Sequence, residues 1–590
     1  MAMWRSVVKA VAFIGLLAFA ASAGEVYFQG AADWEPPPLY HGNAFAPGGV
    51  GGAWWWVYEP LFVYLPGPGD TIPSGVFAGR DRMIPRLGVS YDDTPEAFVV
   101  HLRRNVVWHD GMPFTAKDVW CTFVFGYLKN WAIWNYLEAI EIPDDYTVVF
   151  RWKSPTPFAK LLIAQNVILW PYHIYGKWAE RVDLNVPSSE EPNKTVTEEL
   201  LNFKPEKPIG TGPFMLKEVT ASDMLLLKFP DYWAADKVDF DGVKILRWTN
   251  NYVVWGYLLG GELDAGHPAT RRDITEAILN LPGMRLATPT DLGGFCLAFN
   301  LRETLPDGEP NPFRELKFRQ AIAYAIDRAE LAEACYWAGL PITDYATGLL
   351  ESMRASWGVT DEWMAANLTN YSYDPEKAAR LLTELGYKKG PDGIWEDSQG
   401  NDLKFSLVCH AGYSDWVIAI DDIASQLKEF GIIIEPETRP GSIYWTSIRA
   451  GNFELCMEWT ATSWGFAHPW AELRRTLHKD GDTAKTVDIT AIDILGPDGQ
   501  PVDTTALVDE LGATFDLENQ VELIKSLAWI HNENLLVLPF VEKRIMIFHR
   551  EGVRVTGWPA LDDPAWLLAP GGIERCYTTF MVEDVIEPVK

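Results

Sequence analysis

The segment Phe98–Val119, FVVHLRRNVVWHDGMPFTAKDV, predicts a strand, a tight turn and the start of a helix. The apolar residues that begin at Val99 favour a strand. The pair Asp110–Gly111 favours a turn because glycine tolerates positive φ. Thr115 stands three residues before Asp118, which is the spacing of a capping box at a helix start. The segment is therefore expected to form one strand–turn–helix unit.

Several further segments follow the order of the motifs of a known family. They are Tyr58–Phe62 (YEPLF), Gly210–Phe214 (GTGPF), Pro230–Trp233 (PDYW), Gly260–Asp264 (GGELD), Arg314–Leu331 (RELKFRQAIAYAIDRAEL) and Tyr373–Ala378 (YDPEKA). Together with the first segment, they make the chain resemble the family 5 extracellular solute-binding proteins, the receptors of peptide and oligosaccharide ABC importers. One short motif is weak evidence, whereas this many in register over most of the chain are strong evidence for the resemblance.

The local physics of two of these segments agrees with helices. In the first, apolar residues recur at steps of three and four and give one buried helical face; they are Phe318, Ile322, Ala325 and Ile326. In the second, Asp374 is a natural N-cap and Gly386 a natural C-terminal stop. We expect these residues to be structural, so that they identify the family without binding a ligand.

The resemblance implies an α/β fold of the periplasmic-binding-protein type II-like kind, in which two lobes are joined by a hinge and a third subdomain is inserted. The implied first lobe is discontinuous (residues 24–50, 203–290 and 539–590), the inserted subdomain spans residues 51–202, and the second lobe spans residues 291–538. The chain is expected to cross between the lobes near Asp291 and near Leu538–Phe540. The ligand is expected between the lobes, which close over it by a hinge motion.

The first residues have the pattern of a secretory signal peptide, which spans Met1–Ala23. Arg5 and Lys9 form a charged region, Ala10–Ala20 an apolar region, and Ala21–Ala23 a small-residue cleavage site. We therefore expect the chain to be exported to the periplasm or to the extracellular face of the cytoplasmic membrane. No later apolar run has the length of a transmembrane helix, so the mature protein is expected to be soluble.

Charge and composition exclude several classes of partner. The chain has 590 residues and a formal net charge of −30, which argues against nucleic acid and against an anionic lipid surface. Six cysteines are scattered without C-x-x-C spacing, and no cysteine–histidine cluster has the spacing of zinc ligands. We therefore expect no metal and no cofactor. Export permits disulfides, and the sequence leaves open whether the cysteines pair or remain buried thiols.

Tryptophan is the first feature that bears on the ligand. The chain has 27 tryptophans, including the consecutive residues Trp54–Trp56 and the pair Trp459 and Trp464. An indole face packs on the C–H face of a pyranose, and the indole N–H donates to a hydroxyl group. A single tryptophan is more often a core residue, but three consecutive side chains cannot all face one core. The triplet therefore favours stacking platforms for a sugar.

A missing carboxylate is the second feature. The resemblance places a W-x-x-D stretch in the second lobe of peptide-binding members, whose Asp pairs with the α-ammonium group of the ligand. The matching stretch here begins at Trp459, has Thr462 at the carboxylate position, and contains no acidic residue between Glu458 and Glu472. A buried ammonium group without a counter-charge would cost several kcal/mol. Hydroxyl groups instead suit a neutral, hydroxyl-rich ligand, because they both donate and accept hydrogen bonds.

These two features predict a receptor that captures a neutral oligosaccharide of the cello- or manno-oligosaccharide type. The predicted ligand-binding residues are Trp54, Trp55, Trp56, Asn251, Asn300, Trp445, Trp459, Thr460, Thr462, Ser463 and Trp464. The resemblance implies the transmembrane permease subunits of an ABC importer as the partner. We expect a monomeric receptor.

Two alternatives belong to other classes of ligand or activity. An enzyme is not expected, because the chain has no G-x-S-x-G, H-E-x-x-H, P-loop or Rossmann pattern. An oligopeptide receptor of the same family remains the alternative. It needs a carboxylate from elsewhere in the chain, for which Asp415 and Asp421 are candidates, although both are expected to be exposed residues near a helix start.

Overall fold

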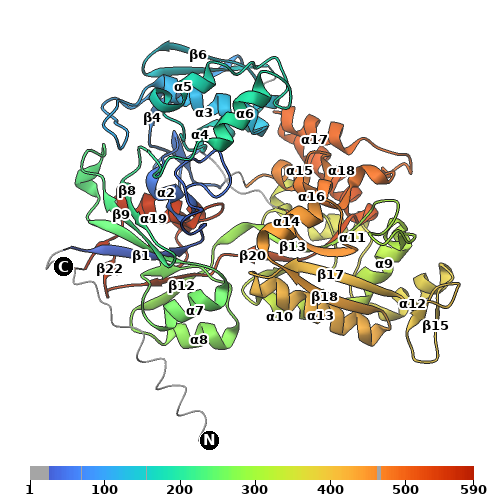
Figure 1. The fold of residues 1–590 in the computed structure, drawn as a ribbon. Coiled ribbons are helices and arrows are strands. Elements are labelled where there is room, and N and C mark those ends of the chain that lie inside the picture. The colour runs from blue at the N-terminus through green and yellow to red at the C-terminus, as the bar shows by residue number, and fades with distance from the viewer. Residues whose placement is uncertain (1–24, 68–69, 154–155, 462–466, 590) are drawn as a thin grey trace, which may run out of the picture.

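The structure is a computed structural model, and it describes residues 25–67, 70–153, 156–461 and 467–589. Two bodies lie side by side and are joined by strands that run between them (Figure 1). The predicted signal peptide lies outside the described residues, as do Thr462, Ser463 and Trp464. In the described part of the chain, no helix combines the length and the apolar character that a membrane crossing requires.

The first body, called the first lobe below, is built on a four-stranded sheet of order β1–β10–β9–β8. The bounds are β1 (Tyr27–Ala32), β8 (Phe214–Val219), β9 (Asp223–Lys228) and β10 (Gly242–Arg247). A smaller sheet has the order β11 (Ala265–Gly266), β21 (Ile547–Arg550) and β12 (Met284–Ala287). The helices of this lobe are α2 (Trp54–Val57), α7 (Asn251–Leu259), α8 (Arg272–Leu279) and α19 (Ile573–Val582). Segments far apart in the sequence therefore share this lobe.

The second body, called the second lobe, surrounds a six-stranded sheet of order β14–β20–β13–β19–β17–β18. The bounds are β13 (Thr290–Phe299), β14 (Leu340–Pro341), β17 (Lys404–His410), β18 (Ile433–Arg439), β19 (Leu455–Thr460) and β20 (Val537–Arg544). Its helices are α9 (Leu316–Ala325), α10 (Arg328–Tyr336), α11 (Asp361–Asn367), α12 (Pro375–Glu384), α13 (Ser414–Phe430), α14 (Gly441–Arg449), α15 (Pro469–Leu477), α16 (Asp482–Val487), α17 (Thr504–Ala513) and α18 (Leu517–Asn534). The central strand β13 is almost entirely apolar and is buried along most of its length, as a strand paired on both sides requires.

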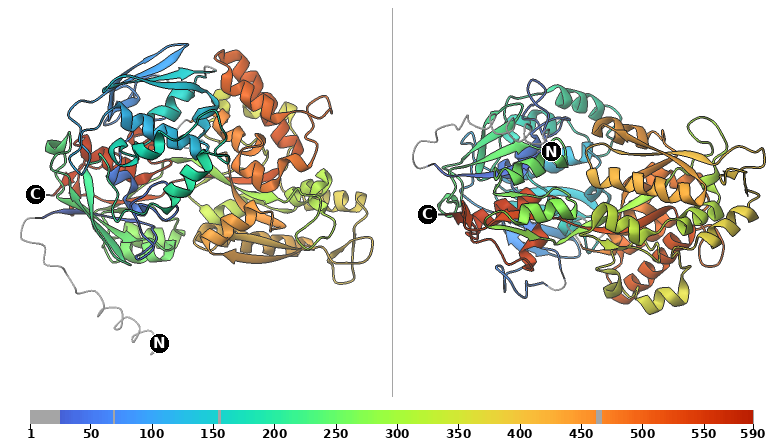
Figure 2. Two further views of the ribbon diagram at one scale, coloured as in Figure 1. Left: turned by 45° about the horizontal axis from the view of Figure 1, so that its top comes forward. Right: turned by 90° about the horizontal axis from the view of Figure 1, so that it is seen from below.

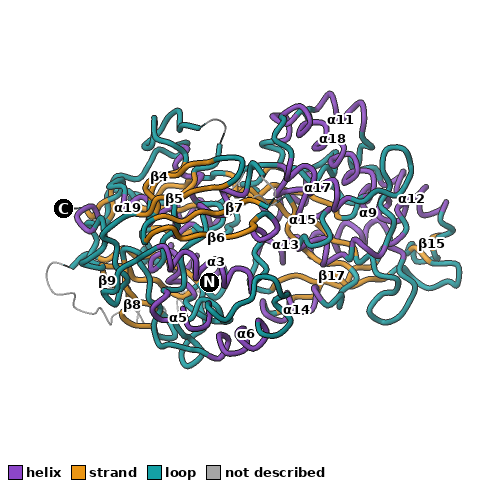
Figure 3. The backbone as a smooth tube through the Cα atoms, turned by 90° about the horizontal axis from the view of Figure 1, so that it is seen from above, coloured by secondary structure: helices purple, strands orange, loops and turns teal. Residues whose placement is uncertain are grey.

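A third sheet lies above the first lobe in the view of Figure 1, and Figures 2 and 3 show the molecule from other sides. Its order is β4 (Gly88–Asp93), β5 (Ala97–Leu102), β7 (Thr147–Trp152) and β6 (Leu137–Asp144). The helices α3 (Ala116–Leu128), α4 (Ala159–Ala164), α5 (Tyr172–Ala179) and α6 (Asn193–Asn202) and the strands β2 (Phe62–Tyr64) and β3 (Met83–Pro85) accompany it. All these elements lie within residues 51–202, the range predicted for the inserted subdomain; the domain boundaries themselves remain a prediction.

The strand–turn–helix unit predicted from Phe98–Val119 is confirmed. Gly111 has φ +84° in the turn between β5 and α3. The backbone N–H of Thr115 donates to the Asp118 carboxylate at 2.6 Å, and the reciprocal bond completes the capping box. The backbone N–H of His109 donates to the carbonyl of Gly210 at 2.9 Å, which joins this unit to the GTGPF segment.

Two other motifs also contact each other in the interior. The buried carboxylate of Glu59, in the YEPLF segment, accepts hydrogen bonds from the Tyr232 hydroxyl at 2.5 Å and the Trp233 indole at 3.1 Å. A Cβ atom at Gly210 would lie 1.9 Å from the carbonyl oxygen of Val57, so only glycine fits there. These motif residues therefore serve the packing of the fold.

The segment Arg314–Leu331 forms two helices, α9 and α10, where the sequence suggested one. The carboxylate of Asp327 accepts from the backbone N–H groups of Ala329 and Glu330 and so caps α10. A local N-cap here competes successfully with helix continuation. The predicted buried face is confirmed, since its four apolar residues are at most 2% exposed.

The chain passes between the two lobes twice, after β12 and after β20. The strands β13 and β20 are antiparallel neighbours with Thr290 opposite Arg544. The backbone N–H of Ile545 donates to the carbonyl of Pro289 at 2.9 Å, so the two passages are bonded to each other. The second passage follows Arg544 at the end of β20, whose apolar start is buried in the sheet.

The third sheet's subdomain also touches the second lobe directly. The Phe158 ring, which precedes α4, stacks on Trp470 with a centroid distance of 5.3 Å and an interplanar angle of 16°. It lies 4.2 Å from the His468 ring and is only 6% exposed. The Thr156 hydroxyl donates to the carbonyl of Gly512 at 2.5 Å. Phe158 is therefore an interlobe contact that fills part of the second lobe's core.

The six cysteines are all buried and none forms a disulfide. The sequence left open whether the cysteines form disulfides or remain buried thiols, and the structure shows buried thiols. The stability of the fold thus rests on apolar packing rather than on covalent cross-links.

Replacing Phe158 with alanine is expected to open the two lobes in the ligand-free protein. Truncating a buried phenylalanine removes contacts worth about 3–5 kcal/mol. Because this ring contacts the other lobe, the loss moves the balance between closed and open forms about a hundredfold or more. Small-angle X-ray scattering should report a larger radius of gyration for Phe158→Ala. Phe515→Ala, at a ring that is 62% exposed, is the matched control and should leave the radius unchanged. An unchanged radius for Phe158→Ala would contradict the expectation.

Candidate functional site

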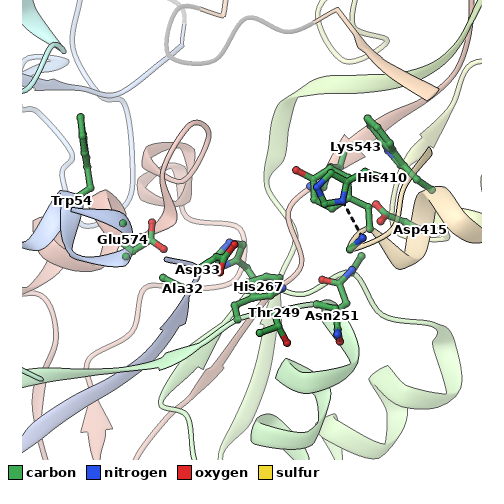
Figure 4. A pocket seen from close by; sticks show the side chains of 18 of the residues that line it. Ala32, Asp33, Trp54, Thr249, Asn251, His267, His410, Asp415, Lys543 and Glu574 are labelled. Carbon is green, nitrogen blue, oxygen red and sulfur yellow. Dashed lines mark hydrogen bonds between the residues drawn. The ribbon is translucent and has the colours of Figure 1, made fainter. Parts of the chain in front are cut away.

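A cavity of about 500 Å³ lies between the two lobes, and its walls come from both of them (Figure 4). Its volume is within the range of small-ligand sites in proteins. The first lobe contributes the ends of β1 and β10 together with α2 and the start of α19. The second lobe contributes the ends of β17, β19 and β20 and the start of α13.

Strand direction explains why the first-lobe wall gathers where it does. The strands β1 and β10 are parallel neighbours, so their carboxyl ends lie at the same edge of the sheet. Asp33 follows β1 directly, and Trp248 follows β10. The backbone N–H of Trp248 donates to the carbonyl of Ala32 at 2.7 Å, which holds the two strand ends together. The side chain of Asn250 then caps α7 by accepting from the N–H of Val253 at 3.1 Å.

The same rule builds the second-lobe wall. The strands β19 and β20 are both antiparallel to β13, and β17 is parallel to β19. The three strands β17, β19 and β20 therefore run in one direction and end at one edge of the sheet. His410, Trp459 and Lys543 stand at or next to these ends and line the cavity. This is the place where ligands bind in open α/β sheets.

Aromatic rings line both walls. Trp54 and Trp55 are half-buried on the first lobe, where Trp55 lies against the backbone of Gly572. On the second lobe Trp459 packs on Trp416 with a centroid distance of 5.6 Å. A flat ligand between the lobes can thus meet an indole face on each side.

A partly buried ion pair lies at the point where the lobes join. The Lys543 ammonium is 3.4 Å from the Asp291 carboxylate and 5.2 Å from the centroid of the Trp459 ring. The register of β13 against β20 shifts between Thr290 and Gly294, so that several residues of β13 face Lys543 alone. Such a bulge redirects side chains, and here it sets Asp291 beside Lys543, which lines the cavity.

Two further carboxylates line the cavity from opposite lobes. Asp415 is 6% exposed, and burial raises its pKa although the Lys543 ammonium opposes this shift. Burial raises the pKa of Glu574 to about 7. Asp33 also lines the cavity, but its side chain is 73% exposed and lies 3.9 Å from the Arg247 guanidinium.

Direct contacts join the lobes beside the cavity. The Asn251 amide donates to the Ser414 hydroxyl at 2.8 Å. The Trp337 indole donates to the carbonyl of Thr270 at 2.9 Å, and Arg272 pairs with Glu333 at 2.6 Å. Together with the contact of Phe158, these bonds hold the lobes against each other around the cavity.

Comparison with known proteins assigns the chain to a family. The model of the bacterial extracellular solute-binding proteins, family 5, matches residues 83–483, which is more than half of the chain. The chain belongs to this family. Its fold is that of the periplasmic-binding-protein type II-like members, as expected. Family 5 receptors are not enzymes, in agreement with the sequence analysis.

Individual relatives are more distant. The chain is 25% identical over 384 residues to the oligopeptide-binding protein AppA of Bacillus subtilis, an alignment that covers 62% of this chain and 63% of that protein. It is 26% identical over 347 residues to the dipeptide-binding protein of Escherichia coli, with 53% and 56% covered. The chain thus spans less than two thirds of the length of these relatives.

A solved structure covers nearly the whole chain. It is the mannohexaose-bound periplasmic oligopeptide-binding protein of Thermotoga maritima, with a TM-score of 0.75 and 23% identity. The likeness covers 96% of this chain and 99% of that one. At this identity it shows the fold alone.

The structure places four of the predicted ligand-binding residues of this family 5 protein on the cavity. They are Trp54, Trp55, Asn251 and Trp459. Thr462, Ser463 and Trp464 lie outside the described residues. The remaining four predicted residues lie elsewhere.

Trp56 is a core residue in this structure and does not line the cavity. It is 1% exposed and packs against Phe28 and Phe214, with centroid distances of 5.8 and 5.9 Å. The reason is the single helical turn α2, which directs Trp54 and Trp55 to the cavity and Trp56 to the sheet. The argument that the three rings cannot share one environment is confirmed.

Asn300, Thr460 and Trp445 also lie away from the cavity lining. The Asn300 amide donates to the carbonyls of Gly451 and Phe453 and fastens the end of β13. Thr460 is fully buried at the end of β19. Trp445, on α14, packs behind the cavity at 6.1 Å from the Trp416 ring. Strand ends and helix packing, rather than ligand contact, account for these three residues.

Sequence reasoning missed several residues of the wall, among them Trp248, Trp416, Lys543 and Glu574. The rule that ligands bind at the carboxyl ends of parallel strands could have found Trp248 and Lys543 once the strands were known. Asp415 was expected to be exposed, and this expectation is wrong. It stands at a helix start as predicted, but α13 begins inside the cavity wall.

The raised pKa of Glu574 predicts how its replacement acts with pH. A carboxyl whose pKa is raised in the folded state favours the protonated form, so its ionisation destabilises the fold as pH rises from about 4.5 to about 7. Glu574→Gln removes this penalty. Urea unfolding of the ligand-free protein should show the variant gaining stability relative to the parent across this interval and a constant difference above it. Glu376→Gln, an exposed second residue of α12, is the control. A difference that does not vary with pH would refute the prediction.

Proposed function

We propose that this chain is the extracytoplasmic receptor of an ABC importer, which captures a neutral oligosaccharide between its lobes and delivers it to transmembrane permease subunits. The oligosaccharide is of the cello- or manno-oligosaccharide type. The observation that carries the proposal is the presence of indole rings on both walls of the cavity. Trp54 and Trp55 stand on one wall and Trp459 on the other.

The chemistry of the walls suits a sugar. Each pyranose ring offers an apolar C–H face to an indole and a rim of hydroxyl groups to polar side chains. Thr249 and Asn250 lie at the first-lobe wall and His410 at the second. Because hydroxyl groups both donate and accept, they can satisfy this mixture of donors and acceptors without any net charge on the ligand.

The comparisons support the class of protein, a solute-binding receptor, and the identity of the ligand is part of the proposal. The Thermotoga maritima protein was solved with mannohexaose bound, although it is called an oligopeptide-binding protein. The Bacillus subtilis and Escherichia coli relatives are named for the binding of peptides. Membership of an extracellular family and the signal-peptide pattern of residues 1–23 together support export.

An oligopeptide receptor is the second candidate, and Asp415 favours it. The W-x-x-D position of this chain has no carboxylate, but the buried Asp415 lines the cavity and could act as the counter-charge for an ammonium group. Against it, the nearby ammonium of Lys543 already attracts Asp415 and would repel a second cation. We therefore place the peptide receptor second.

A thermal-shift screen separates the two ligands. Protein from residue 24 onward is mixed with cello-, manno-, xylo- and malto-oligosaccharides and, in parallel, with di- to pentapeptides. A ligand at about 100 times its Kd adds about 2.7 kcal/mol to the free energy of unfolding, which gives a readable rise in Tm. The proposal expects a rise with one sugar series. A rise with peptides alone would overturn it.

Replacing Trp459 tests the stacking role with the sugar that the screen identifies. Burying an aromatic face contributes about 1.5–3 kcal/mol, so Trp459→Ala should weaken binding about tenfold or more. Calorimetric titration measures the Kd. Trp363→Ala, at a half-buried ring of α11 outside the cavity lining, is the matched control and should bind as the parent does. Equal affinities of Trp459→Ala and the parent would show that the Trp459 indole does not bind the sugar.

A further inference from the structure

Two carboxylates face the interlobe cavity from opposite sides, and the aromatic walls do not account for them. Glu574 is the second residue of α19 in the first lobe, and Asp415 is the second residue of α13 in the second lobe. Both line the cavity, and Figure 4 shows them on opposite sides of it. They are separate from the Asp291–Lys543 ion pair.

Two buried carboxylates of the second lobe, Glu458 and Glu542, have side-chain partners. Glu458 pairs with Arg449 at 3.0 Å and with Arg475 at 3.4 Å. Glu542 accepts from the Ser352 hydroxyl at 2.6 Å and from the Thr290 hydroxyl at 2.9 Å. Burying a carboxylate without such partners costs free energy, so proteins supply them wherever the role of the group is structural.

Glu574 and Asp415 lack partners of this kind. Among the described residues, no side chain donates a hydrogen bond to either carboxylate, and neither forms an ion pair within 4.0 Å. The Asp415 carboxylate is approached by the backbone N–H groups of Asp415 and Trp416 at the start of its own helix. The Glu574 carboxylate is likewise approached by the backbone N–H of Glu574 itself. Their acceptor oxygens are therefore available to a ligand in the cavity.

The position of both residues in their helices keeps them effective acceptors. Each stands in the first turn of a helix of ten or more residues, where the helix macrodipole favours negative charge. The helices α13 and α19 begin at the cavity, one from each lobe. A ligand held between the lobes thus meets an acceptor at the start of each helix.

We propose that Glu574 and Asp415 are ligand-binding residues that clamp one sugar from opposite lobes, each accepting hydrogen bonds from ligand hydroxyl groups. This inference rests on the proposed function and extends it. A carboxylate accepts from two donors at once, which matches the two adjacent hydroxyl groups of an unsubstituted pyranose. Above about pH 7, where the Glu574 carboxyl is ionised, bonds of this kind with a charged acceptor are stronger than those between neutral groups.

The clamp also defines which sugars the cavity rejects. A uronic acid residue between the lobes would bring a third carboxylate close to Glu574 and Asp415 in a desolvated space, where like charges repel strongly. The ammonium of Lys543 is already paired with Asp291, so the described residues of this wall offer no free cation to offset the repulsion. The cavity therefore selects neutral over acidic oligosaccharides.

The test compares Glu574→Gln and Asp415→Asn with the parent protein by calorimetric titration. The ligands are neutral cello-, manno-, xylo- and malto-tetraose and an oligogalacturonide of similar length. Each amide keeps the size of the side chain and loses its charge. We expect each variant to bind the preferred neutral sugar at least tenfold more weakly. We expect the parent to bind the oligogalacturonide at least tenfold more weakly than the neutral sugar, with a smaller ratio in the variants.

Matched controls and unfolding curves separate a binding role from a structural one. Glu376→Gln and Asp273→Asn change exposed second residues of α12 and α8 in the same way and should bind as the parent does. Ligand-free Glu574→Gln and Asp415→Asn should unfold at a temperature equal to or above that of the parent, because each loses a carboxylate whose ionised form is disfavoured by desolvation. A lower unfolding temperature in both variants would assign a structural role and overturn the clamp.

The outcomes distinguish this inference from the proposed function. If the parent binds a neutral sugar and both variants bind it within twofold of the parent, the clamp is wrong and the proposed function stands. If the parent binds no neutral sugar and binds peptides instead, the proposed function falls. The clamp falls with it, because it requires a ligand with hydroxyl donors.

Discussion

The antiparallel pairing of β13 with β20 is the constraint on which the candidate site depends. Both passages of the chain between the lobes lead into this pair, and the bond from Ile545 to Pro289 joins them. The pairing gives β19 and β20 the same direction, so that their ends meet at one edge. The bulge that begins after Thr290 then brings Asp291 and Lys543 to that edge. Leu292 lies inside the bulge with φ +53°, a conformation that a branched residue adopts only where the surrounding structure holds it.

Local signals in the sequence predicted local structure well. The capping box of Thr115 and Asp118 and the N-cap of Asp374 act through bonds between residues three apart, and all are present in the structure. The family motifs predicted the fold because their residues bond to one another in the interior, as Glu59 does with Tyr232. Such contacts restrict which residues fit, and this restriction is what makes a motif recognisable in one sequence.

The site was predicted only in part, because its residues come together through contacts between distant segments. The Thr578 hydroxyl of α19 donates to the carbonyl of Trp55, which is 523 residues away in the sequence. No local pattern connects Glu574 to Trp54, although both line one cavity. Periodicity placed Asp415 correctly at a helix start, but burial depends on what packs against the helix. For the same reason the sequence could not tell which ring of Trp54–Trp56 faces the sheet.

The discontinuous first lobe has a consequence for the order in which the chain folds. Strand β21 lies between β11 and β12, and α19 packs against α2, so residues before 290 and after 545 complete each other. The six-stranded sheet of the second lobe, in contrast, is formed by one continuous stretch, residues 290–544. A chain that emerges amino end first can therefore finish the second lobe while the first still waits for its last strand and helix. The half of the chain that emerges first is therefore the half whose fold is completed last.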